Sequence, residues 1–148
     1  MLKEQLLIPA RRGAVIDDCV VLIDEQVASK SGLSGLAIKG AYAVVKAVKP
    51  GIIRESVDHM LDEFVARLEP FYAAALGAGG DIPAHFATHK ADVANGLLGV
   101  TDDKAAHARN ATLKKAYEKL RPTAQKHVEA AVPGIARLLA RHASPAAA

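Results

Sequence analysis

Proline and glycine residues divide this chain into blocks of helix length, and the apolar residues inside each block recur at helical spacing. In the block from Pro9 to Ala28, for example, Val15, Cys19 and Leu22 stand at positions i, i+4 and i+7. Residues with this spacing form one face of an α-helix. No stretch alternates apolar and polar residues over the length of a strand between hairpin turns. The pattern therefore predicts an all-α fold.

The same prolines and glycines predict where the helices begin and end. A proline disfavours helical geometry in the residue before it and fits the first turn of a helix, so Pro50, Pro83 and Pro122 mark boundaries. Pro70 should break or kink a helix, and Gly77–Gly80 should be a flexible joint between two helical halves. Five to six helices are expected, over residues 9–28, 33–48, 51–68, 83–99, 101–120 and 122–142, with residues 71–76 as a short addition. Whether residues 102–142 form one kinked helix or two stays open at this point.

Two side chains are suited to cap the helices that follow them. Asp81 precedes Pro83, which would occupy the first turn. Thr101 precedes two aspartates, which favour the positive end of a helix dipole. Both positions are therefore expected to be helix starts.

Residues 33–48 stand out because almost their whole helical circumference is apolar. The polar positions share one narrow stripe with a glycine: Gly35, Lys39, Tyr42, Lys46 and Lys49. A helix of this kind is usually the buried central element of a domain, and small residues such as Ala37 and Gly40 would let neighbouring helices approach closely. The alternative, a helix lying in a membrane interface, needs a broader charged face. We expect a compact bundle around this apolar central helix.

The length of 148 residues is about that of one ordinary domain. Apolar residues make up 51% of the chain, which is enough for a continuous core. We therefore expect a single all-helical domain over residues 1–142. Residues 143–148 consist of Ala, Ser and Pro at the chain end, and we expect a disordered tail there.

Neither targeting nor membrane insertion is indicated. Lys3 and Glu4 precede only three apolar residues before Pro9, too few for a signal peptide. The most apolar window, residues 33–48, carries two lysines and is shorter than the roughly 20 residues that span a bilayer. The single Cys19 cannot form a disulfide within the chain and fits a reducing compartment. These features predict a cytoplasmic protein without a membrane span.

Charge is distributed unevenly along the chain. Residues 1–74 hold nine Lys and Arg against ten Asp and Glu, whereas residues 75–148 hold ten against six. Lys104, Lys115 and Lys119 share one face of an expected helix, which could meet an anion or a nucleic acid. Aromatic residues that would stack on bases make up only 4% of the chain, and no nucleic-acid-binding signature occurs. A solvated helical face is the preferred interpretation, and binding by this basic C-terminal half is an alternative.

The best candidate for a metal-binding site is the pattern His85-x-x-x-His89-x-x-Asp92. On a single helix these three side chains would share a face, and two imidazoles with a carboxylate are a plausible ligand set for zinc or another divalent ion. A second cluster on the helix expected over residues 51–68 could complete a bundle site: Glu55, Asp58, His59 and Asp62. The alternative is that both clusters are ordinary polar faces of amphipathic helices, which carry Asp, Glu and His in any case.

Other catalytic arrangements have little support. Cys19 lies on the apolar face of its helix, where a buried thiol is inert. The turn Ser31–Gly35 could hold an anion at a helix start, but capping explains it and the Gly-Lys-Ser/Thr ending of a phosphate-binding loop is absent. No Gly-x-Ser-x-Gly elbow occurs. The sequence therefore points away from an enzyme and predicts no cofactor beyond the divalent metal.

Several segments are familiar in combination: residues 30–39 (KSGLSGLAIK), 48–51 (VKPG), 68–72 (LEPFY), 99–102 (GVTD), 114–121 (KKAYEKLR) and 131–134 (AVPG). With them, almost the whole chain resembles a family of small bacterial proteins that is classed as a domain of unknown function. The resemblance implies a compact helical domain, and it brings no activity, cofactor or catalytic residue.

The alanine-rich, site-poor sequence favours a non-catalytic protein that acts by binding a protein partner or by self-association. Two alternatives remain at this stage. One is a metal-binding helical bundle that uses His85, His89 and Asp92. The other is a binder of anions or nucleic acid that uses the basic C-terminal half.

Overall fold

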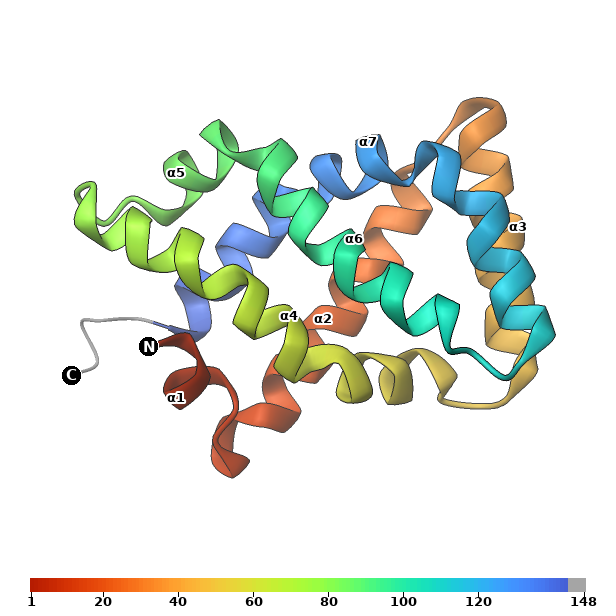
Figure 1. Ribbon diagram of the computed structural model, residues 1–148, viewed down its shortest axis with the longest axis horizontal. Coiled ribbons are helices and arrows are strands. Elements are labelled where there is room, and N and C mark those ends of the chain that lie inside the picture. The colour runs from red at the N-terminus through yellow and green to blue at the C-terminus, as the bar shows by residue number, and fades with distance from the viewer. Residues whose placement is uncertain (144–148) are drawn as a thin grey trace.

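The computed structural model describes residues 1–143, which form helices and no strand. The predicted all-α fold is therefore confirmed for this part of the chain. It contains seven helices (Figure 1): α1 (Leu2–Leu6), α2 (Pro9–Ser29), α3 (Gly32–Val48), α4 (Ile52–Gly77), α5 (Ile82–Thr88), α6 (Lys90–Ala106) and α7 (Ala111–His142). The number exceeds the expected five to six because the chain starts with an extra helix and because residues 82–106 form two helices that are divided at His89.

Helix α1 was not expected, since five residues are too few for a stable isolated helix. Its stability comes from tertiary contacts. Leu2 and Leu6 lie one turn apart and are fully buried in the main core. The backbone N–H of Leu2 also donates to both carboxylate oxygens of Glu69 on α4, at 3.1 and 2.9 Å. Burial of the two leucines and this charge-assisted hydrogen bond stabilise α1, which is too short to be stable through helix propensity alone.

Helix α4 runs through Pro70, so of the break and the kink expected there the break, with a helix end near residue 68, was wrong. The helix ends instead at the glycine-rich joint, as predicted. Gly79 and Gly80 adopt φ values of 111° and 87°, which glycine reaches without steric cost. Asp81 then caps α5 as expected, because its Oδ1 accepts the backbone N–H of Ala84 at 3.0 Å.

The helix expected over residues 83–99 is interrupted. His89 separates α5 from α6, with a φ of −111° and a ψ of 24° that lie outside the helical range. Helix α6 then continues through Thr101, where a new helix was expected. The Thr101 hydroxyl bonds back to the carbonyl oxygen of Leu98 at 3.1 Å and meets the Tyr117 hydroxyl at 2.7 Å, so it does not cap.

The C-terminal half is organised by one long helix. The chain breaks at residues 107–110, and Asn110 caps α7 by accepting the backbone N–H groups of Thr112 and Leu113 at 2.9 and 3.1 Å. Residues 111–142 therefore form a single helix that contains Pro122 and Pro133. Helix α7 changes direction along its course in Figure 1, as expected where a proline removes a backbone hydrogen bond.

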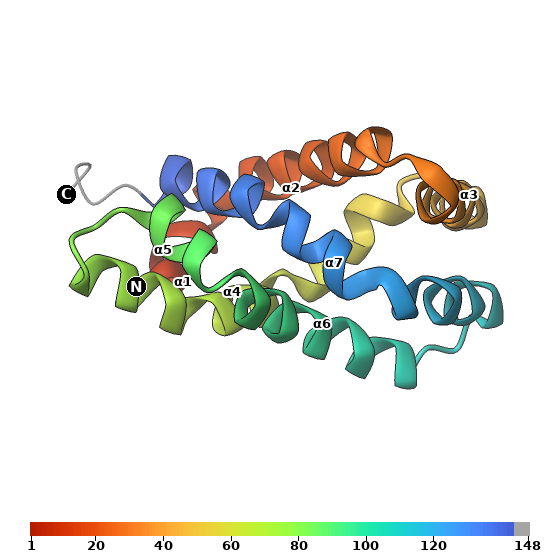
Figure 2. The same ribbon diagram turned by 90° about the horizontal axis from the view of Figure 1, so that it is seen from above.

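Helix α7, and not the helix over residues 33–48, is the central element. It packs against α2, α3, α5 and α6, and Figure 2 shows it crossing between α2 on one side and α6 on the other. Helix α3 lies at one end of the molecule. The main core cluster draws residues from the other six helices and none from α3. The expectation of an apolar central helix over residues 33–48 is therefore corrected.

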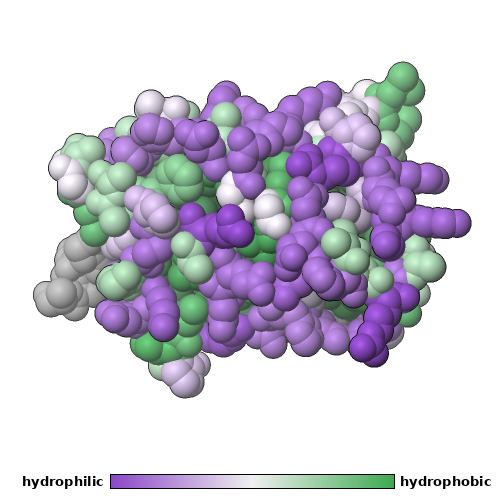
Figure 3. Space-filling view, viewed as in Figure 1, coloured by the Kyte–Doolittle hydropathy of each residue, from purple (hydrophilic) through white to green (hydrophobic). Residues whose placement is uncertain are grey.

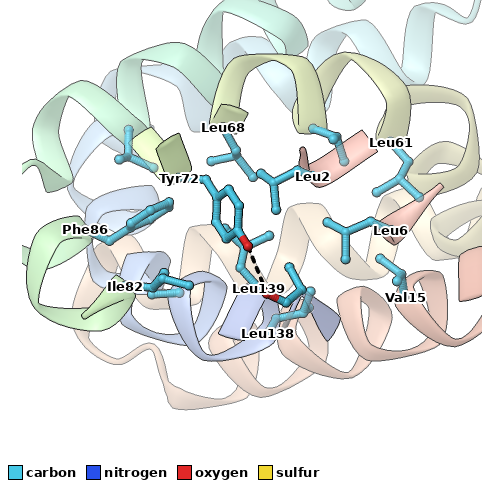
Figure 4. Close-up of a cluster of buried hydrophobic side chains, with 14 of the residues drawn as sticks. Leu2, Leu6, Val15, Leu61, Leu68, Tyr72, Ile82, Phe86, Leu138 and Leu139 are labelled. Carbon is cyan, nitrogen blue, oxygen red and sulfur yellow. Dashed lines mark hydrogen bonds between the residues drawn. The ribbon is translucent and has the colours of Figure 1, made fainter. Parts of the chain in front are cut away.

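The core is centred on α4, α5 and the end of α7 (Figure 4). Tyr72 is fully buried there, and its hydroxyl donates to the carbonyl oxygen of Ala143 at 2.9 Å. Ala143 is itself buried, so the first residue of the expected tail belongs to the packed structure. The rest of that tail, residues 144–148, lies outside the described residues. No helix within residues 1–143 has the length and apolarity needed to cross a membrane, as expected.

Candidate functional site

Helix α3 exposes a face that is much broader than the narrow polar stripe in its sequence. Its buried residues are Gly35 and Ile38, and Gly35 packs so closely that a Cβ atom there would lie 2.7 Å from the carbonyl carbon of Lys30. Tyr42 also turns toward α2, where its hydroxyl donates to Asp24. Gly35 and Tyr42, two members of the narrow polar stripe, therefore anchor α3 to its neighbour α2.

The face left in solvent is apolar. We define the α3 stripe as Leu33, Leu36, Gly40, Ala43, Val44 and Ala47, which are all exposed. At about 100° per residue they fall within roughly 100° of arc along the helix. Leu33 is 88% exposed, Leu36 67% and Val44 47%. Figure 3 shows hydrophobic surface at its upper right corner, over the start of α3.

Charged residues border the α3 stripe without entering it. Helix α3 contains no Asp or Glu, and Lys39 and Lys46 lie along one edge of the stripe. The neighbouring helix α2 exposes Glu25. None of these three side chains forms an ion pair within residues 1–143; Lys46 lies over the Tyr42 ring, 5.2 Å from its centre. The two lysines at the edge of the stripe and the glutamate of α2 therefore have no ion-pair partner within the described residues.

The sequence contains one signal for the α3 stripe, a heptad repeat of apolar and small residues. Leu33, Gly40 and Ala47 recur every seven residues, with Leu36 and Ala43 between them. This heptad spacing is typical of a helix that packs along another helix. It was masked because Ile38, Ala41 and Val45 make the inward side apolar as well, so the pattern does not say which side faces the core.

The predicted metal ligands come from two helices. His85 lies on α5 and His89 at its end, and their ring centres are 4.4 Å apart. Asp92 lies in the first turn of α6, beyond the interruption at His89. Within residues 1–143 no three His, Cys, Asp or Glu side chains converge into a set that could hold a metal ion. The structure thus brings the two histidines together, and the three-residue site stays a prediction.

The carboxylates of the second predicted cluster, on α4, form ion pairs with basic residues outside α4. Arg12 of α2 contacts Asp58 at 2.9 Å and Asp62 at 2.5 Å, and these carboxylates raise the pKa of the guanidinium. Glu55 contacts Lys49 at 2.7 Å, and the hydrogen bond to that ammonium lowers the pKa of the Glu55 carboxyl. These carboxylates connect helices and do not point toward His85 or His89 as a shared set.

Cys19 packs against the core as expected. Burial raises the pKa of its thiol to about 11, which keeps the thiol protonated and unreactive at neutral pH. In the turn before α3, Ser31 makes no side-chain capping bond. Binding of an anion there stays a prediction.

Part of the basic C-terminal half is neutralised within the fold. Lys104 contacts Glu63 at 3.0 Å, Arg121 contacts Asp102 at 2.8 Å, and Arg141 contacts Asp18 at 3.0 Å, so each cation pairs with an acidic residue of another helix. Arg121 and Tyr117 lower the pKa of Asp102 through their hydrogen bonds. The remaining basic residues leave nucleic-acid binding as an untested alternative.

A comparison with models of protein families matches residues 2–143 to a family of unknown function, DUF6918. The chain belongs to this family. The match confirms the resemblance to an uncharacterised domain and spans every helix described above. Two further comparisons, with curated proteins and with solved structures, gave no match.

Proposed function

We propose that this protein is a single, non-catalytic helical domain of the cytoplasm that acts by self-association through the α3 stripe. The observation that carries the proposal is the exposure of Leu33 and Leu36 on a charge-free helix face. Contiguous apolar surface of this kind marks interaction sites in proteins that are otherwise well packed. A second copy of α3 is the occupant that fits the stripe best.

Two features favour a second copy over an unrelated partner. Small residues at Gly40, Ala43 and Ala47 let another helix approach closely, and an added Cβ at Gly40 would meet no atom within 4 Å. The same chain also supplies complementary charge. Lys39 and Lys46 on α3 can pair with a carboxylate such as Glu25 of α2 in the other copy, and such rim pairs orient an interface.

The test is the oligomeric state of purified protein by sedimentation velocity or light scattering over a range of concentrations. We expect a dimer that dissociates on dilution. Leu36→Lys should weaken it by about tenfold or more, because burying a leucine side chain contributes about 1.5–3 kcal/mol and a buried unpaired ammonium adds a penalty. Circular dichroism should show an unchanged fold, since Leu36 is exposed within the protomer.

Leu76→Lys is the matched control. Leu76 is also an exposed leucine, 41% accessible, but it lies at the end of α4 and outside the α3 stripe. This variant should dimerise like the wild type. A wild-type chain that stays monomeric at high micromolar concentration, or equal weakening by both substitutions, contradicts the proposal.

The predicted metal site is a second candidate function, and one contact supports it. The His85 and His89 rings lie side by side, so both could ligate one divalent ion with Asp92 or water completing its coordination. The proposal is weaker than the first because only two ligands are adjacent.

A further inference from the structure

An apolar cavity of about 380 Å³ lies between α2, α4, α6 and α7, and Ile38 of α3 closes part of its wall. Its volume falls in the range of about 300–1,000 Å³ typical of small-molecule sites. Leu6, Val15 and Leu61 belong to its lining, and Figure 4 shows these three side chains pointing toward one another. The cavity is partly open to solvent, and apolar walls of this kind accept apolar molecules.

Apart from Thr101 of α6, the polar side chains of this lining are on α2 and α7. They are Gln26, Lys30 at the C-terminal end of α2, and His127. The Lys30 ammonium has one hydrogen bond, a long one of 3.4 Å to Oε1 of Gln26, and no carboxylate within residues 1–143 pairs with it. The Nε2 atom of His127 is shielded from solvent and has no hydrogen-bond partner within the same residues. Nε2 of His127 therefore lacks a partner among the described residues, and the Lys30 ammonium has only this one long hydrogen bond.

The cavity wall at Lys30 and His127 is also electropositive. Burial lowers the pKa of Lys30, and the nearby Lys126 lowers it further. Burial, Lys30 and Lys126 together lower the pKa of His127. The positive charges of Lys30, Lys126 and protonated His127 repel one another, and no carboxylate of the described residues pairs with Lys30 to compensate. An anion placed between Lys30 and His127 would relieve this repulsion and accept both hydrogen bonds.

We propose that the cavity binds a fatty carboxylate, with the alkyl chain among the apolar side chains and the carboxylate on Lys30 and His127. The apolar walls exclude sugars and nucleotides, whose hydroxyl groups and phosphates would lose their hydrogen bonds there. A neutral hydrocarbon would leave Nε2 of His127 without a partner and the Lys30 ammonium without a counter-ion. A single alkyl chain ending in one anionic group satisfies both parts of the cavity.

The experiment is isothermal titration of protein freed of bound lipid, with three probes: decanoate, decanol and acetate. We expect decanoate to bind one to one, decanol to bind about tenfold more weakly because it lacks the charged hydrogen bonds, and acetate not to bind. Lys30→Met should remove the preference for decanoate over decanol. His127→Gln should reduce it.

Matched variants locate the site. Lys115→Met removes an exposed lysine of the same helix α7 that carries His127, and it should leave the preference intact. Ala131→Phe extends a wall residue into the cavity and should abolish binding of both alkyl probes; Ala124→Leu is the smaller substitution if the first variant does not fold. Titrating the Leu36→Lys variant separates this result from self-association.

Three results would overturn the proposal. One is failure of both alkyl probes to bind the wild type. The second is binding that survives a folded cavity-filling variant, which would place the alkyl chain elsewhere. The third is a preference for decanoate that persists in Lys30→Met and His127→Gln alike, which would place the carboxylate elsewhere.

Discussion

His85 and His89 are adjacent because four positions separate them along one helical turn, which His89 ends. Their rings are tilted by 41°, with 4.4 Å between ring centres. Two neutral imidazoles at this distance can share a divalent ion, but a tight site needs a third or fourth ligand. Weak binding is therefore the expected outcome.

We predict that zinc titration will show stoichiometric but weak binding, which His89→Ala will remove. His107→Ala is the control, because His107 is exposed and contacts only Asp103 of its own turn. Elemental analysis of the untagged protein gives an independent measure of bound metal. If wild type, His89→Ala and His107→Ala take up zinc equally, the ion binds elsewhere and the predicted site is wrong.

At the scale of elements, the contact between α2 and α3 depends on one small residue. Gly35 lies in the first turn of α3 with its backbone against the backbone of Lys30. The atom that an added Cβ would meet at 2.7 Å belongs to the main chain and cannot move aside as a flexible side chain would. Any larger residue must therefore push the start of α3 away from the end of α2.

We predict that Gly35→Ala destabilises the protein by about 1–3 kcal/mol, as overpacking does. Gly13→Ala is the matched control, because Gly13 lies in α2 with no atom within 4 Å of an added Cβ. That variant should be more stable than the wild type by up to about 1 kcal/mol, since alanine favours a helix interior. Urea unfolding curves measure both. Stabilisation of similar size by both substitutions would show that the close approach of α3 to Lys30 does not exist.

At the scale of the whole molecule, α4 holds both ends of the described chain. Glu69 accepts the backbone N–H of Leu2, and Tyr72, three residues later, donates its hydroxyl to the carbonyl oxygen of Ala143. Nearby, His142 and Arg141 contact Asp18 of α2 at 2.5 and 3.0 Å. The hydrogen bond from His142 is the main cause that lowers the pKa of Asp18. The end of α7 is thus fixed to two other helices.

We predict that Tyr72→Phe lowers the free energy of unfolding by about 1–3 kcal/mol, because it leaves the buried carbonyl oxygen of Ala143 without a donor. Tyr42→Phe removes a hydrogen bond to the exposed Asp24, whose carboxylate water can solvate, so its effect should be much smaller. Chemical denaturation monitored by circular dichroism compares the two variants. Equal losses of stability would contradict the importance of the buried bond.

The sequence alone determined the class of the fold and many of its boundaries. Helical spacing of apolar residues, the cap at Asp81 and the glycines before it depend on interactions within a few residues, so they can be recognised locally. The same local rules failed at Thr101, and at Pro70 they did not distinguish a helix end from a helix that continues. There the helices continue because contacts with distant parts of the chain outweigh the local preference, as the bond between Thr101 and Tyr117 illustrates.

The tertiary structure alone decided which surfaces are buried. The sequence marks α3 as apolar on nearly every side, and only the positions of α2 and α7 show that Ile38 faces inward and Leu36 outward. It likewise contains Lys30 and His127 without indicating that they share a cavity wall, since 97 positions along the chain separate them. Helix formation depends on neighbouring residues, whereas burial depends on which distant segments come together. That difference is why most helices were predictable, whereas the exposed side of α3 and the lining of the cavity were not.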